Sequence, residues 1–259
     1  RKESSAASDV YKRQHLIKYL VSFFIIFNIA SCSDVTNFDD IRSSSLIKPN
    51  FLAKQARYDC TFEKDKSLNR LEAFIPGLVA KAKILSSEIS LEFLFNQKNN
   101  INIFSILYSD NKNDFNSTKI TDLLNKEGIE SIAVCELKED EFFSMDIFIE
   151  DLSQQLNLFE VEILYCEFNE GFNYGTFSIE VDSFLNLVRK KDVSYFAKFQ
   201  QANMSSNKFI WMNYLGSELD KEILYKGWVE EEDSILIQEA FNSQSTCKSA
   251  SSYKGYKVL

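Results

Sequence analysis

Apolar residues in the C-terminal part of the chain recur with two different spacings. Between 177 and 188 they return every three or four positions, which predicts an amphipathic helix. From 193 to 199 they alternate with polar residues, and another apolar run spans 209–215, so two strands are predicted there. A strand around 164–168 precedes these elements. A helical stretch follows them, and a last, less clear strand lies near Cys247.

The N-terminal part shows the same order of patterns. A strand over 58–62 and a helical pattern over 68–82 come first; strands over 91–95 and 103–108, a helical stretch and a strand over 132–137 follow. Pro76-Gly77 is expected to kink or shorten the first helix. Residues 140–150 either extend the last strand or begin a helix. The chain therefore divides into one module at 55–150 and a second at 158–259, each ordered β-α-β-β-α-β.

This order resembles the ferredoxin-like half of dimeric α+β barrel proteins. The resemblance implies an α+β fold of two tandem ferredoxin-like modules that form a pseudo-dimeric barrel, with the first and last strands of each module as neighbours. Proteins of this type include cofactor-independent monooxygenases, in which Asn, Trp and Tyr side chains hold an aromatic substrate. They also include haem-degrading relatives that need an axial His.

A separate apolar run covers 19–30. It is shorter than the roughly 20 residues that a membrane-spanning helix needs. It follows Lys18 and ends in Ile29-Ala30-Ser31-Cys32, which resembles the lipobox of bacterial lipoproteins. The resemblance implies a signal peptide at 15–31, acylation of Cys32 as the anchor to the bilayer, and a tether at 32–54. Ser33 after the cysteine implies an outer-membrane lipoprotein facing the periplasm. Residues 1–14 resemble translated sequencing-adapter read-through and are left out of the fold prediction.

Four cysteines remain after Cys32, and an even number in an exported protein predicts disulfides. Three pairings are possible. The similar flanking sequences and the implied neighbouring strands favour Cys60 with Cys135 and Cys166 with Cys247. The alternative is four buried free thiols and no duplication.

Charge and the scarcity of histidine exclude several classes of function. Residues 1–31 hold five of the 29 basic and two of the 38 acidic residues, so the exported part has 24 basic and 36 acidic side chains and a net charge of −12. Such a surface repels phosphate backbones, and no nucleic-acid partner is expected. The one histidine is His15, inside the signal segment, so no His-based triad, zinc site or haem ligand is expected. We predict no cofactor, metal site or catalytic residue.

One group of residues is a candidate ligand pocket. Trp211 and Asn213 share one face of a predicted strand, and Trp228 lies in the following helix, from which it can lean over that strand. Asn173 and Tyr174 are further candidates for the ligand pocket, because they lie in a glycine-containing loop before a helix. The alternatives are core packing and a tight turn. The residues favour a non-catalytic envelope lipoprotein that binds a small apolar ligand or another envelope protein, over a cofactor-independent monooxygenase or a structural envelope component.

Overall fold

The computed structural model describes residues 47–85, 89–96, 103–110, 116–148, 158–203, 205–248 and 251–258. All of them belong to one compact unit, 45–259. The predicted signal peptide at 15–31, Cys32 and the tether up to residue 46 lie outside the described residues, as do residues 1–14. None of the helices in the described ranges has the length and apolarity required to span a membrane.

The first module begins with a strand and ends with a long one. Its elements are β1 (Ala53–Phe62), α3 (Leu68–Leu85), β2 (Ile89–Asn96), β3 (Ile103–Asp110), α4 (Ser117–Glu127), the 3-10 turn η1 (Ile129–Ser131) and β4 (Ala133–Phe148). Residues 140–148 thus extend the last strand. Of the two expected effects of Pro76-Gly77, a kink or a shorter helix, the shortening does not occur, because α3 continues through Pro76. Pro76 and Gly77 lie on the exposed face, while the buried Leu71, Ile75 and Leu78 hold the other face against the sheet.

The second module repeats the order with one added helix. Its elements are β5 (Leu158–Phe168), α5 (Tyr174–Arg189), β6 (Tyr195–Gln201), β7 (Lys208–Leu215), α6 (Glu218–Glu230), α7 (Glu232–Gln244), β8 (Ser245–Cys247) and β9 (Ser251–Lys257). The single helical stretch expected after β7 is two helices, which meet at Glu231 in extended conformation. The last strand is likewise split into β8 and β9.

Antiparallel pairing joins the strands into one closed sheet. In the first module the strands lie in the order β4-β1-β3-β2, and in the second the order is β8-β5-β7-β6. β8 and β9 pair with successive parts of β5 and so share one position. The far end of β4 pairs with β6, and β9 pairs with β2, which closes an eight-stranded ring in the described part of the chain. The fold is therefore α+β, with an eight-stranded barrel.

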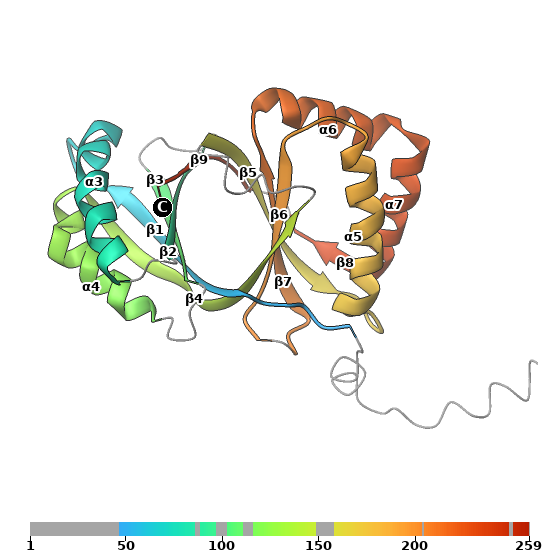
Figure 1. The fold of residues 1–259 in the computed structure, drawn as a ribbon, viewed down its shortest axis with the longest axis horizontal. Coiled ribbons are helices and arrows are strands. Elements are labelled where there is room, and N and C mark those ends of the chain that lie inside the picture. The colour runs from blue at the N-terminus through green and yellow to red at the C-terminus, as the bar shows by residue number, and fades with distance from the viewer. Residues whose placement is uncertain are drawn as a thin grey trace, which may run out of the picture. The chain divides into compact units, whose positions relative to one another are not determined.

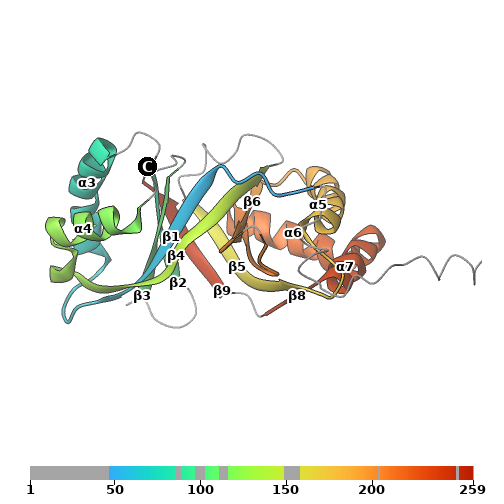
Figure 2. The same ribbon diagram turned by 90° about the horizontal axis from the view of Figure 1, so that it is seen from below.

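The helices cover the outer face of the barrel (Figures 1 and 2). Alternate strand residues point outward and form two separate cores. Tyr58, Phe93 and Ile106 pack with α3 and α4, whereas Phe199 and Trp211 pack with α5 and α7. The intervening residues point into the barrel. This alternation explains why the strand pattern was readable in the sequence.

Each module has its own disulfide, as predicted. Cys60 is bonded to Cys135 between β1 and β4, and Cys166 to Cys247 between β5 and β8. In both pairs the cysteines lie directly opposite each other in the sheet register, with their Cα atoms 4.0 Å apart. The alternative of four free thiols is therefore wrong.

Polar side chains inside the barrel connect the two modules. Lys198 Nζ on β6 lies 2.5 Å from Glu92 Oε1 on β2, and the Tyr214 hydroxyl donates to Glu92 Oε2 at 2.8 Å. The Glu92 and Lys198 side chains are 4% and 8% exposed. Burial lowers the pKa of Lys198, but the charges of Glu92 and Asp146 outweigh it, so the pKa is raised. The lysine therefore stays charged.

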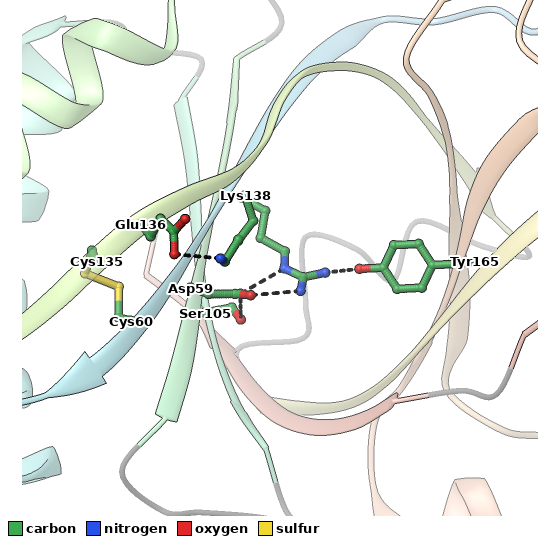
Figure 3. Close-up of polar contacts among 8 residues, drawn as sticks. Asp59, Cys60, Ser105, Cys135, Glu136, Lys138 and Tyr165 are labelled. Carbon is green, nitrogen blue, oxygen red and sulfur yellow. Dashed lines mark hydrogen bonds and ion pairs between the residues drawn. A yellow bond between two sulfur atoms is a disulfide. The ribbon is translucent and has the colours of Figure 1, made fainter.

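A second group of polar side chains also connects the two modules (Figure 3). Tyr165 on β5 points toward the first module, where its hydroxyl accepts a hydrogen bond from Arg57. The same guanidinium donates to both carboxylate oxygens of Asp59, at 3.0 and 3.2 Å, and the Ser105 hydroxyl donates to Asp59 at 2.7 Å. Burial raises the pKa of Asp59, but these donors outweigh burial and lower the pKa overall. The ionised carboxylate is thus part of the contact between the modules.

Candidate functional site

A cavity of about 290 Å³ lies between the outer face of the second module's sheet and helices α5, α6 and α7. β5 and β7 form its floor, because outward-pointing residues of these paired strands lie side by side. Leu164 is directly opposite Trp211, and Cys166 is directly opposite Phe209. The residues that line the cavity are Glu162, Leu164, Cys166, Phe177, Phe184, Phe209, Trp211, Asn213, Leu224, Tyr225, Trp228, Phe241, Asn242, Ser245 and Cys247.

One end of the cavity is mainly aromatic, with Asn242 and Ser245 as the polar residues that line it. Phe177 contacts Phe209, Trp211 and Phe241 with ring centroids 5.1, 5.7 and 5.1 Å apart. The Cys166–Cys247 disulfide lines the same end. Phe184 and Trp228 meet edge to face at 5.3 Å and form a wall from the helices. Such a surface favours an apolar molecule through burial and ring contacts.

The other end carries Asn213, whose amide orientation is set by its neighbours. The Trp211 indole N–H donates to Asn213 Oδ1 at 2.7 Å, and the Tyr195 hydroxyl donates to the same oxygen at 2.7 Å. An indole N–H can only donate, so the oxygen must face Trp211 and the NH₂ group must face away from it. Among the described residues, Asn213 Nδ2 has no hydrogen-bond partner.

Glu162 lies beside Asn213, because the two are directly opposite in the β5–β7 register. Its Oε2 accepts a hydrogen bond from the Tyr225 hydroxyl of α6, whereas Oε1 has no hydrogen-bond partner within the described ranges. Burial raises the pKa of Tyr225, and the bond to Glu162 raises it further, so the phenol stays protonated and remains a donor. The polar end therefore presents one donor, Asn213 Nδ2, and one acceptor, Glu162 Oε1.

Three of the five predicted pocket residues, Trp211, Asn213 and Trp228, line this cavity. Asn173 and Tyr174 are not among the lining residues. Asn173 is the N-cap of α5, where its Oδ1 accepts from the amide of Gly175 at 2.8 Å. The Tyr174 ring packs against Phe199 at 5.0 Å. The structure thus uses this loop to start a helix and to pack its core.

The sequence prediction missed Glu162, Tyr225 and the wall contributed by α7. One signal was available for Glu162. It is a charged residue in a strand, and its same-face neighbours on the C-terminal side, Leu164, Cys166 and Phe168, are apolar. No sequence signal indicated Tyr225, because its position over Glu162 depends on how α6 crosses the sheet. Within the described residues, no cluster of three or more His, Cys, Asp or Glu side chains is arranged to hold a metal ion.

Comparison with known proteins gives no family assignment. No family model and no curated protein matches the chain. Among solved structures, a candidate monooxygenase from Fusobacterium nucleatum is 13% identical with a TM-score of 0.49, covering 82% of this chain and 94% of its own. A candidate chlorite dismutase is 7% identical with a TM-score of 0.48, covering 80% and 95%. A DyP-type peroxidase from Mycobacterium smegmatis is 8% identical with a TM-score of 0.47, covering 82% and 94%.

Proposed function

We propose that this protein is a lipid-anchored envelope protein whose second module binds a small apolar ligand. The cavity between β5, β7 and the helices α5, α6 and α7 carries the proposal. Its volume of about 290 Å³ is close to the lower end of the range for small-molecule sites, roughly 300–1,000 Å³. Largely apolar walls with a few convergent polar groups are the usual composition of such sites. Trp211, Asn213 and Trp228 would contact the ligand directly.

The two modules are, in this proposal, tandem ferredoxin-like repeats that form a pseudo-dimeric α+β barrel. Support comes from the matching strand orders and from the equivalent disulfides between first and last strands. The repeats have diverged in the layer above the sheet. The second module has two helices there, α6 and α7, where the first has α4 and a short turn. The extra helix contributes Phe241 to the wall of the cavity.

The proposed anchor is the acylated Cys32, with outer-membrane sorting and exposure to the periplasm. The lipobox Ile29-Ala30-Ser31-Cys32 supports it, as does the presence of two disulfides, which form in oxidising compartments. Two or more acyl chains hold a protein stably at a bilayer, since each buried CH₂ contributes about 0.8 kcal/mol. Cys32→Ala is expected to move the protein from the membrane fraction to the soluble fraction or to leave it unprocessed. Unchanged membrane fractionation would contradict the anchor.

Ligand binding can be tested through the two tryptophans. The chain has only Trp211 and Trp228, and both line the cavity, so an apolar ligand should change their fluorescence. A suitable probe is 1-adamantanol, which is compact and does not absorb in this range. Leu164→Phe, which adds bulk to the floor, should weaken its binding at least tenfold. Leu158→Phe is the matched control, because Leu158 lies on the same strand, is 71% exposed and does not line the cavity.

Three results would separate this proposal from the others. No saturable fluorescence change with any apolar probe would leave a structural envelope component as the better explanation. Equal binding by the Leu164→Phe and wild-type proteins would place the ligand elsewhere. A cofactor-independent monooxygenase is the second candidate, favoured by the hydrogen-bonded group of Tyr195, Asn213 and Trp211 beside an apolar cavity. It requires oxygen uptake with a polycyclic phenol, and Trp211→Phe should abolish that uptake.

A further inference from the structure

The two ends of the cavity floor carry different side chains. Glu162, Leu164 and Cys166 follow one another on the outer face of β5, so Glu162 lies at one end of the floor and the disulfide at the other. A strand rises about 3.3 Å per residue, which separates the two ends by about 13 Å. A ligand in this cavity therefore places its apolar body near Phe177 and the disulfide, and its head group near Glu162.

The head group meets two different polar atoms. Asn213 Nδ2 is a donor whose orientation is set by Trp211, and Glu162 Oε1 is an acceptor whose neighbouring oxygen is bonded to Tyr225. A group that both accepts and donates satisfies the two together, as a hydroxyl or a primary amide does. An ammonium group can donate to Glu162 but leaves the Asn213 amide without an acceptor.

A carboxylate or phosphate head group is disfavoured for an electrostatic reason. It would place a negative charge beside the Glu162 carboxylate in a half-buried site, where like charges repel more strongly than in water. None of the described residues that line the cavity is an Arg, Lys or His that would offset the repulsion. The negative net charge of the whole chain, −9, acts in the same direction.

We infer that the cavity selects apolar alcohols or amides and rejects the corresponding carboxylates, with Glu162 as the residue that determines this choice. The inference rests on the proposed ligand-binding function and adds the chemical class of the ligand. Fatty acids and other apolar anions are excluded as ligands on this basis, whereas an uncharged apolar molecule with a hydroxyl or amide head is accepted.

The test compares two probes with the same apolar body, 1-adamantanol and 1-adamantanecarboxylate, by tryptophan fluorescence titration of the full chain at neutral pH. The wild-type protein should bind the alcohol at least tenfold more tightly than the carboxylate. Glu162→Gln keeps the size of the side chain and removes its charge, so the difference between the probes should shrink at least fivefold. Glu167→Gln is the matched control, because Glu167 is an exposed carboxylate on the same strand and does not line the cavity. It should behave as the wild type.

The outcomes distinguish the two proposals. If neither probe binds, the ligand-binding function itself fails. If both probes bind wild-type protein equally, or if Glu162→Gln leaves the preference unchanged, the cavity binds ligands but Glu162 does not select them, and the inference is overturned. A folding defect in Glu162→Gln would appear as weaker binding of both probes. In that case Tyr225→Phe, which removes the partner of Oε2 and leaves Glu162 in place, should retain the preference for the alcohol.

Discussion

The buried ion pair between Glu92 and Lys198 leads to a quantitative prediction about how the two modules are joined. Lys198→Met removes the positive charge and keeps most of the side-chain volume. At an effective dielectric constant of about 20, two unit charges 2.5 Å apart attract each other by about 7 kcal/mol. Much of this attraction offsets the free energy of removing both ions from water. When only the lysine is removed, the desolvated carboxylate stays behind, and breaking such a pair costs about 3–5 kcal/mol.

A neighbouring carboxylate adds to this effect. Burial raises the pKa of Asp146, Lys198 lowers it and Glu92 raises it. Lys198→Met therefore removes a favourable partner from Asp146 as well. The expected loss of about 3–5 kcal/mol is a large fraction of the 5–15 kcal/mol by which a domain is typically stable. The variant should still fold but should unfold at a much lower denaturant concentration.

The assay is urea unfolding followed by tryptophan fluorescence, with the disulfides intact. The control is the double variant Glu92→Gln/Lys198→Met, in which the glutamine oxygen still accepts from the Tyr214 hydroxyl. Replacing both charges removes both desolvation penalties and takes one attractive and one repulsive charge away from Asp146, so the double variant should be within about 1–2 kcal/mol of the wild type. The reasoning is refuted if Lys198→Met loses less than about 1 kcal/mol, or if the double variant is as unstable as the single one.

The Glu92–Lys198 pair places opposite charges where the two modules meet. Lys257 lies opposite Glu92 in the β2–β9 register, and Asp146 lies opposite Lys198 in the β4–β6 register. If the modules are the tandem repeats proposed above, Glu92 and Lys198 occupy equivalent positions and carry opposite charges. In a symmetric dimer of identical modules, two carboxylates or two ammonium groups would meet at this point. A single chain with two modules of different sequence can place opposite charges there.

Three further predictions follow from other parts of the fold. Replacing Cys166 and Cys247 together by alanine should lower the free energy of unfolding by about 2–4 kcal/mol in the same urea assay, and alkylation without reductant should label neither of them in the native protein. Asp59 has a lowered pKa, so its stabilising contribution is present above its unfolded pKa of 3.8 and is lost as the pH falls through the lower folded value. Asp59→Asn should therefore reduce the loss of unfolding free energy below about pH 4. An unchanged dependence of stability on acid pH would contradict this. In Gly255→Ala the new Cβ would lie 2.3 Å from a Phe159 ring carbon, so the free energy of unfolding should fall by about 1–3 kcal/mol or more. In Gly77→Ala, within helix α3, the new Cβ meets no atom closer than 4.0 Å, so the free energy of unfolding should rise by up to about 1 kcal/mol.

The sequence by itself determined most of the order of the elements and favoured the observed pairing of the cysteines. Strand residues alternate because one face packs on helices, and that alternation is a property of the chain alone. It revealed β7 with Trp211 and Asn213 on one face, and the helix that carries Trp228. The four cysteines that follow Cys32, each on a first or last strand of a module, were sufficient to favour one of three pairings, which the structure confirms. These features depend on local spacing, which a single sequence contains.

Only the tertiary structure determined which side chains contact each other. Glu162 and Tyr225 meet because α6 packs on the outer face of the sheet, and no spacing along the chain encodes that contact. Glu92 and Lys198 are 106 positions apart and meet because the barrel closes. Pro76 lies within a helix because it is on the exposed face of that helix, so the buried face still packs on the sheet. Local patterns determine elements, whereas the packing of whole faces determines which side chains converge into a cavity or an ion pair.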